Sequence, residues 1–232
     1  MCIRDRYWID HNREKVDRLS GGRVGYVYLS DMESLGMEQF IRQFYAQLNK
    51  QALIIDDRWN NGGFIDQIVL ERLRRVLVGM GTNRERAAEE SPQEFVDGPK
   101  VVLMNHYSAS DGDIFPYYFR QYGLGKLIGT RTWGGVRGIR GNWTMLDGGS
   151  ITVPEHSLYG TDGKWIIENH GVDPDIEVED VPGEFLTDHD IQLETGVKTL
   201  TDELAQKPHV VMQPPPLLPA YPPEGNVPPA SH

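Results

Sequence analysis

Apolar positions in the first half of the chain form two kinds of segment. The stretch RVGYVYLS (residues 23–30) alternates and is rich in aromatic and β-branched residues, as expected of a strand. Two other stretches, QALIIDDR (51–58) and KVVLMNH (100–106), are continuous apolar runs that end in polar residues. Such runs are typical of strands that are buried on both faces. The pattern therefore predicts three strands in this half.

Helical periodicity separates and follows these three strands. Apolar residues recur at helical spacing in 33–50, and the same spacing returns in 64–80 and in 110–123. The order strand, helix, strand, helix, strand, helix predicts an α/β fold with a mostly parallel sheet and flanking helices. The apolar face expected of the first helix consists of Leu35, Phe40, Ile41, Phe44, Tyr45 and Leu48.

The second half of the chain has a different pattern. Residues 141–160 read as a hairpin around Asp147-Gly148-Gly149, and 164–179 read as a strand, a turn and another strand. Residues 187–206 are expected to form a closing helix that Thr187 or Asp188 caps. The apolar stripe of this helix would be Ile191, Val197, Leu200 and Leu204.

Composition narrows the class of protein. Apolar residues make up 39% of the 232 residues, and no apolar run approaches the roughly 20 residues of a membrane span. The formal net charge of −11, with no basic stripe, argues against a nucleic-acid surface. The one cysteine, Cys2, forms no internal disulfide, and no metal-binding motif is visible. We therefore expect no cofactor, no nucleic acid and no membrane partner.

A serine at a predicted strand-to-helix junction raises a choice between two roles. Ser110 lies between the apolar run 100–106 and the helical pattern that follows, where serine commonly caps a helix. The same place suits a nucleophile, because the free N–H groups of the first turn, beginning with Asp111, can hold an oxyanion. The Asn60-Asn61-Gly62-Gly63 loop can bring a second N–H, since glycine lets the main chain approach closely. Pattern alone leaves both roles open.

Five blocks, taken together, resemble a known family. GRVGYVYLSDM, LIIDDRWNNGGFIDQ, NHYSASDGDIFPYYFR, LIGTRTWGG and IIENHGVDPDIEVE occur in this order. They are similar to the tail-specific and tricorn serine proteases, family S41, and most to the tricorn branch, over about residues 7–206. SASDGD and ENHGVDPD are the most specific blocks. The resemblance implies a crotonase/Clp protease-like fold of β-β-α units.

The resemblance assigns roles to individual residues. Ser110 in SASD matches the family nucleophile, and the N–H of Asp111 matches one oxyanion donor. A glycine of NNGG matches the other donor, with Gly62 preferred over Gly63. Glu168 in ENHGV matches the acid that supports the catalytic machinery. Other polar residues of the first loop are interpreted as its structural supports: Asp57, Arg58 and Asn60.

The general base is where the chain departs from the family. The tail-specific branch uses a lysine in a T-x-G-K-G segment, but Gly135 occupies that position here. The tricorn branch uses a histidine that lies upstream, before a PDZ domain, and nothing before Tyr7 matches it. We therefore expect a truncated fragment that lacks the catalytic histidine. His170, two residues after Glu168, and His106 remain as internal candidates.

The same comparison predicts three parts of the chain. Residues 1–22 are read as a non-native leader followed by a linker after a missing PDZ domain. Residues 23–206 are read as the catalytic domain, and 207–232 as a proline-rich tail. The cellular location is not specified by the sequence: the resemblance implies the cytoplasm, with a periplasmic or secreted protein as the alternative.

Function follows as an expectation. The resemblance implies a serine endopeptidase that acts on peptides or unfolded polypeptides through an acyl-enzyme on Ser110, within a homo-oligomeric parent protein. Arg137 or Arg140 could bind a peptide carboxylate. An acidic residue of the charged segment 81–98 could select basic side chains, with Glu89, Glu90 and Glu94 as candidates. The alternatives are a non-catalytic peptide-binding or scaffold module and an acyl-CoA enzyme of similar fold.

Overall fold

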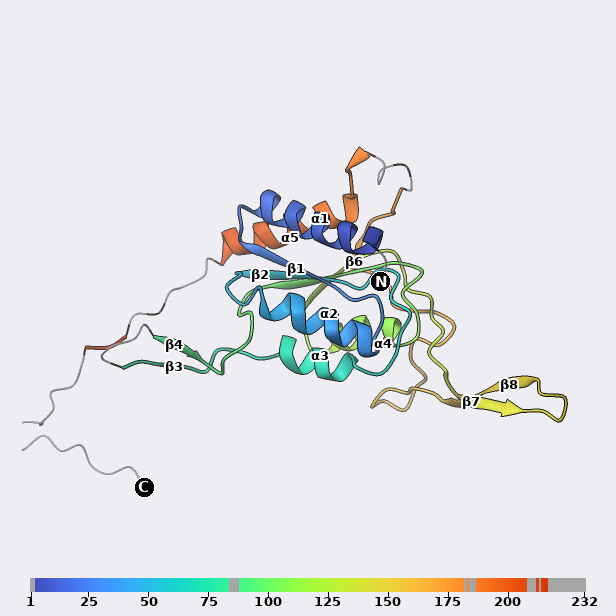
Figure 1. Cartoon of the computed structure of the whole chain (residues 1–232). Coiled ribbons are helices and arrows are strands. Elements are labelled where there is room, and N and C mark those ends of the chain that lie inside the picture. Colours follow the sequence, from blue (N-terminus) through green and yellow to red (C-terminus); the bar gives the residue numbers. More distant parts are fainter. Residues whose placement is uncertain are drawn as a thin grey trace, which may run out of the picture. The chain divides into compact units, whose positions relative to one another are not determined.

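A computed structural model describes most of the chain in two compact units. One unit comprises residues 1–76 and 94–209, and the other comprises 77–93 and 210–232 (Figure 1). Each is described by itself. The described residues are 3–83, 88–181, 183, 187–207, 212 and 214–216.

A five-stranded sheet forms the centre of the first unit. Its order is β1-β2-β5-β6-β9, and every neighbouring pair is parallel. This confirms the expected α/β fold with a mostly parallel sheet. The sequence analysis predicted the first three strands and did not assign β6 as a strand. The strands are β1 (Val24–Tyr28), β2 (Ala52–Asp56), β5 (Lys100–Met104), β6 (Gly125–Gly129) and β9 (Ile176–Glu177).

Helices cover both faces of this sheet (Figure 1). The helices α2 (Ser34–Tyr45), α3 (Asp66–Leu73) and α4 (Asp111–Gln121) contribute apolar side chains to one core cluster. The helices α1 (Ile3–Ser20) and α5 (Ile191–Gln206) contribute to a second cluster on the opposite face. The sheet is therefore the middle of three layers.

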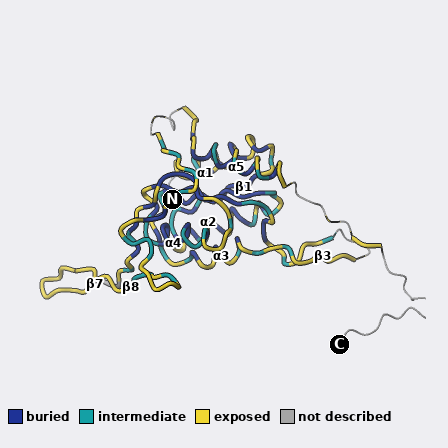
Figure 2. The backbone as a smooth tube through the Cα atoms, turned by 180° about the vertical axis from the view of Figure 1, so that it is seen from behind, coloured by how far each residue is buried: buried dark blue, intermediate teal, exposed yellow. Residues whose placement is uncertain are grey.

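This layering explains why two strands read as continuous apolar runs. Side chains of a strand alternate between its two faces. In β2, Leu53 and Ile55 join the cluster under α2, α3 and α4, whereas Ile54 joins the cluster under α1 and α5. All five residues of β2 and of β5 are buried, which Figure 2 shows as dark blue segments.

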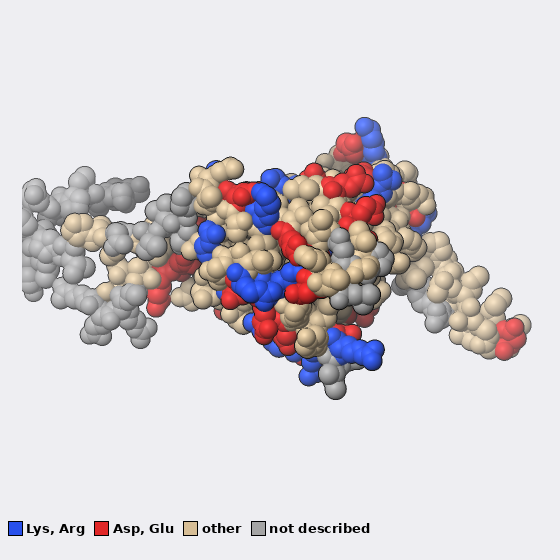
Figure 3. Space-filling view, turned by 90° about the horizontal axis from the view of Figure 1, so that it is seen from above, with Lys and Arg blue, Asp and Glu red and all other residues tan. Residues whose placement is uncertain are grey.

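The N-terminal helix was not predicted as an element of the fold. Most of its residues are polar or charged, so its apolar periodicity is weak. In the structure Ile9 and Val16 are buried in the same cluster as Leu200 and Leu204 of α5. Acidic and basic side chains lie among one another on the surface seen from above in Figure 3, with no basic patch there.

Several local expectations need correction. Residues 164–168 form no strand of the sheet; the described contact there is one bridge between Tyr159 and Trp165. The helix pattern of 64–80 ends as a helix at Leu73. In α2, Leu35 and Ile41 are exposed and lie outside the core.

The cap of α5 also differs from the expectation. Asp190, rather than Thr187 or Asp188, occupies the cap position, and its Oδ1 accepts the N–H of Leu193 at 3.0 Å. Asp188 has a left-handed backbone with φ of 59°, and its carboxylate contacts His11. Ile191 lies outside the buried stripe, because α5 begins there and its side chain is exposed.

Two antiparallel strand pairs lie outside the main sheet. The predicted hairpin is confirmed: β7 (Gly138–Thr144) pairs with β8 (Ser150–His156), and the N–H of Met145 donates to the carbonyl of Gly149 at 2.8 Å. In the second unit, β3 (Gly79–Gly81) pairs with β4 (Glu89–Ser91). Across the described residues, no helix is long and apolar enough to cross a membrane.

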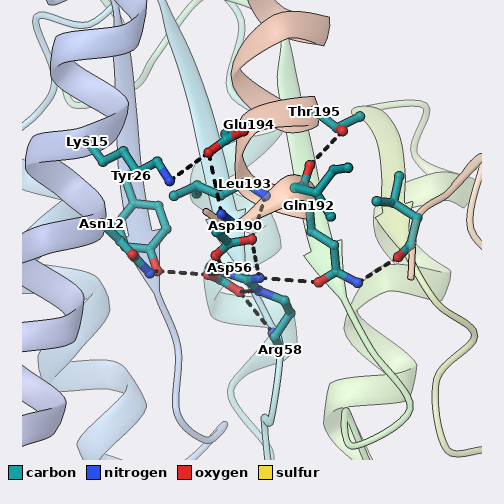
Figure 4. Close-up of polar contacts among 12 residues, drawn as sticks. Asn12, Lys15, Tyr26, Asp56, Arg58, Asp190, Gln192, Leu193, Glu194 and Thr195 are labelled. Atoms are coloured by element: carbon teal, nitrogen blue, oxygen red, sulfur yellow. Dashed lines mark hydrogen bonds and ion pairs between the residues drawn. The ribbon is translucent and has the colours of Figure 1, made fainter. Parts of the chain in front are cut away.

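A buried ion network joins the end of β2 to the start of α5 (Figure 4). The Arg58 side chain is fully buried; its Nη2 lies 2.7 Å from Oδ2 of Asp56 and 2.9 Å from Oδ2 of Asp190. The guanidinium also lies 5.8 Å from the ring centre of Trp8 and 5.3 Å from that of Trp59. One side chain thus connects a strand, a loop and two helices that are far apart in the sequence.

Removing this arginine should cost much of the stability of the domain. Arg58→Ala leaves two buried carboxylates without their counter-charge, so we expect a loss of about 3–5 kcal/mol in the free energy of unfolding. Arg72→Ala is the matched control, because Arg72 pairs with Glu94 at 3.4 Å in an exposed position, where a loss of at most about 1 kcal/mol is expected. Urea unfolding measures both; similar losses would contradict a special role for Arg58.

Candidate active site

Two loops meet at the carboxyl ends of neighbouring strands. β2 and β5 are paired in parallel, with Asp56 opposite Leu103, so the loops that follow them lie side by side. The Ser108 hydroxyl donates to the carbonyl of Asp57 at 2.8 Å, and the N–H of Ala109 donates to the carbonyl of Asn60 at 2.9 Å. The structure therefore brings together the two blocks that sequence reasoning singled out.

Ser110 occupies the position before the first residue of α4. Its backbone has φ of 56° and ψ of −116°, an uncommon conformation for a residue with a side chain. Its hydroxyl makes no capping hydrogen bond to the helix. The residue therefore holds the place of a cap without doing a cap's work, and its backbone strain is of a kind that often occurs at functional sites.

The NNGG loop packs directly against Ser110. A Cβ atom on Gly62 would lie 2.6 Å from Cβ of Ser110 and 2.9 Å from the nitrogen of Asp111. Gly62 has φ of +83°. Glycine is thus required there both for its conformation and for the close approach to Ser110.

Backbone donors differ between the two glycines of this loop. The N–H of Gly62 donates to Oδ1 of Asn60 at 2.8 Å, so it is already paired. For Gly63 and Asp111, the described part of the chain offers the N–H no hydrogen-bond partner. Two unpaired donors therefore lie on the two loops that meet at Ser110.

Glu168 is bound to the loop that follows β6. Its Oε2 accepts the N–H of Val136 at 3.0 Å, and its Oε1 lies 3.6 Å from Nε of Arg137. Both neighbours of Glu168 in the sequence, Ile167 and Asn169, have left-handed backbones. Glu168 is therefore held in a tight turn rather than in the regular strand that sequence reasoning expected.

The two candidate histidines lie away from Ser110 in their contacts. Nε2 of His170 bonds to Oδ2 of Asp173 at 2.8 Å. His170 and His106 line one cavity of about 690 Å³, together with Trp133, and Ser110 is not among its lining residues. Among the described hydrogen bonds, none joins Ser110 to a histidine or a lysine.

Residues proposed to contact the substrate fare unevenly. Arg137 is more than half exposed, beside Glu168. Arg140 pairs with Val153 through its strand, and its side chain is outside the described part of the structure. Glu94 forms an ion pair with Arg72. The other two acidic candidates, Glu89 and Glu90, belong to β4 in the second unit, and no contact connects them here with the site.

Buried carboxyl groups surround the two loops, and sequence reasoning did not identify them as a group. Oδ2 of Asp111 accepts the N–H of Asp66, the first residue of α3, at 3.2 Å. Burial, and secondly the nearby charge of Asp66, raise the pKa of Asp111 to about 8. Burial likewise raises the pKa of Asp66. This pair connects the helix after Gly63 to the helix after Ser110.

Two further acids lie behind the pair. Asp57 is wholly buried, and burial followed by the charge of Asp113 keeps its pKa well above the ordinary value. Oδ1 of Asp113 accepts the N–H of Gly134 at 2.7 Å. The acidic residues of DD (56–57) and SASDGD (108–113) were the signal in the sequence, but their burial depends on the tertiary packing. Within the described residues, no His, Cys, Asp or Glu group of three could hold a metal ion.

The raised pKa of Asp111 predicts a pH-dependent stability. The unfolded carboxyl ionises near its ordinary pKa of 3.8, whereas the folded one stays protonated up to about 8. Its favourable contribution is therefore complete at low pH and is lost as the pH rises from about 4 to about 8. Asparagine stays neutral throughout this range.

Asp111→Asn should accordingly gain stability relative to the wild type between pH 5 and pH 9. We expect a relative gain of at least about 1.4 kcal/mol, the equivalent of one pKa unit. Thermal or urea unfolding at both pH values provides the measurement. Asp10→Asn, at an exposed position of α1, is the control and should follow the wild-type curve. A gain in Asp111→Asn that does not change with pH would show that this carboxyl is ionised in the folded protein.

Known proteins resemble this chain in sequence and in structure. The model of "Peptidase family S41" matches residues 23–178. The tricorn protease of Thermoplasma acidophilum is 40% identical over 202 residues, 87% of this chain and 19% of that protein. The putative tricorn-like protease C-terminal subunit of Sulfurisphaera tokodaii is 41% identical over 204 residues, 87% of this chain and 24% of that protein.

A solved structure gives the same result for the fold. The crystal structure of the tricorn protease superposes with a TM-score of 0.83 at 40% sequence identity, covering 88% of this chain and 20% of that one. The chain thus spans about a fifth of the length of the relatives it matches. Since the family model covers well over half of its residues, the chain belongs to peptidase family S41.

Proposed function

We propose that this chain is the nucleophile-bearing domain of a serine endopeptidase that cleaves peptides or unfolded polypeptide segments. One observation carries the proposal: Gly62 packs against Ser110 so closely that no side chain fits between them. This contact brings the unpaired N–H groups of Gly63 and Asp111 to the nucleophile loop. Membership of the S41 family supports the same reading.

The proposed reaction has two halves. Oγ of Ser110 adds to the carbonyl carbon of a peptide bond while its proton passes to a base. The C–N bond then breaks, and the amine leaves with a proton. A water molecule, deprotonated in its turn, hydrolyses the ester and releases the carboxylic acid and the free serine.

The oxyanion formed on the way needs two donors, and we propose Asp111 and Gly63. Backbone N–H groups aimed at the developing charge supply much of the rate enhancement in acyl transfer. The resemblance offered Gly62 and Gly63 as alternatives. The N–H of Gly62 is bound by Asn60, whereas that of Gly63 is unpaired. The pairing therefore favours Gly63.

Glu168 is proposed to act through the loop that it holds. Its carboxylate fixes the N–H of Val136 and the guanidinium of Arg137, so it positions the chain that borders the site. Arg137, and with it Arg140, is proposed to bind a carboxylate of the peptide, because a guanidinium offers paired donors to such a group.

We propose that the general base comes from a part of the protein outside this chain. A base must lie within hydrogen-bond reach of the serine hydroxyl, roughly 3 Å. His170 is engaged by Asp173 instead, and the matched relatives are about five times longer than this chain. The same missing contact favours the alternative, a non-catalytic peptide-binding module of this fold.

Ser110→Ala tests whether this serine is a nucleophile or a cap. Because its hydroxyl makes no capping bond, the variant should change the free energy of unfolding by less than about 0.5 kcal/mol, against about 1 kcal/mol for a lost cap. A fluorophosphonate probe should label the wild type slowly and the variant not at all. A large stability loss with unchanged labelling would assign Ser110 to capping alone.

The isolated 232-residue chain should be nearly inactive on fluorogenic peptides. Oxyanion donors and binding alone leave only about 10³–10⁴-fold acceleration over water. His106→Ala and His170→Ala should therefore leave this low rate unchanged. Robust turnover that either variant abolishes would show that the base is internal.

A further inference from the structure

A cavity of about 530 Å³ opens beside the loop that carries Gly63. It lies between the residues before α2 and the residues before α3. Its apolar lining consists of Met32, Met37, Phe64 and Ile65, and its polar lining of Glu33 and Ser34.

Backbone hydrogen bonds attach the wall of this cavity to the proposed oxyanion loop. The N–H of Met32 donates to the carbonyl of Gly62 at 2.7 Å, and the carbonyl of Met32 accepts the N–H of Phe64 at 2.7 Å. A Cβ atom on Gly63 would lie 2.0 Å from the carbonyl oxygen of Met32. The cavity and the unpaired N–H of Gly63 are therefore parts of one rigid arrangement.

The lining has the chemistry of a site for an apolar group. Phe64 is 86% exposed although it directly follows Gly63, and Met37 is half-buried. Binding sites for organic groups are mostly apolar with few polar residues. Methionine adapts its shape to different partners. The other cavity near the loops, lined by Arg131, Asp173 and Glu177, is largely polar and does not offer such a surface.

We propose that this cavity is a substrate subsite that receives an apolar side chain of the polypeptide, next to the bond that is cleaved. The inference rests on the proposed function, which places the scissile carbonyl oxygen at the N–H of Gly63. The cavity lining begins with the next residue, Phe64. A residue that flanks the carbonyl therefore projects its side chain toward this wall.

Peptide binding tests the subsite without requiring turnover. The protein is the full 232-residue chain with Ser110→Ala. The probes are fluorescein-labelled octapeptides of alanine and serine, with leucine, lysine or glycine at one position at a time. Fluorescence anisotropy should show one position at which leucine binds about 10–100-fold more tightly than glycine, as expected for burying one large apolar side chain.

Variants of the lining locate this preference. Phe64→Ser and Met37→Gln should each lower the leucine-to-glycine ratio several-fold. Because the Phe64 side chain is so exposed, Phe64→Ser should keep the fold, which circular dichroism checks. Leu19→Ser, an exposed apolar position on the opposite face of the sheet, should leave the ratio unchanged.

The outcomes separate the subsite from the proposed function. Lack of leucine selectivity, including lack of binding, or selectivity that survives both lining variants, overturns the subsite. A stronger preference for lysine than for leucine overturns it as well. Leucine selectivity that the lining variants abolish, with no fluorophosphonate labelling of Ser110 in the wild type, keeps the cavity as a peptide site and overturns the serine mechanism.

Discussion

The domain depends on one buried cation. Arg58 carries the only positive charge between the carboxylates of Asp56 and Asp190 in the described part of the sheet's carboxyl end. Taking these charges out of water is costly, and only their mutual pairing offsets the cost. Because Asp190 also caps α5, the ion network fixes where that helix begins. The loop that follows Arg58 thereby starts from a rigid point.

The candidate site is built on that rigid start. From Arg58 the chain reaches Gly62 and Gly63 within five residues, and Gly62 contacts Ser110. Behind the contact, Asp66 and Asp111 join the helices that follow each loop. A protonated carboxyl can accept and donate hydrogen bonds in a place where an ionised pair would repel. The spacing of the two loops is therefore tied to the packing of buried acids, and the backbone donors need no rearrangement to meet an oxyanion.

What the site lacks among its described contacts is as informative as what it holds. The nucleophile loop, the backbone donors and an apolar cavity are joined by short hydrogen bonds, but no base bonds to Ser110. Binding and oxyanion stabilisation are thus separable from proton transfer in this chain. Family S41 membership is consistent with a site that several parts of a larger protein complete, as the length of the matched relatives allows.

Local patterns in the sequence were enough for the central strands, the hairpin at Asp147-Gly148-Gly149 and the place of Ser110, because continuous apolar runs and turn residues report on their own surroundings. The polar helix α1 and the choice of Asp190 as a cap were decided by contacts with residues more than a hundred positions away. The same holds for the donors of the site. Whether Gly62 or Gly63 offers a free N–H depends on where the Asn60 side chain points, and only the packed loop determines that direction.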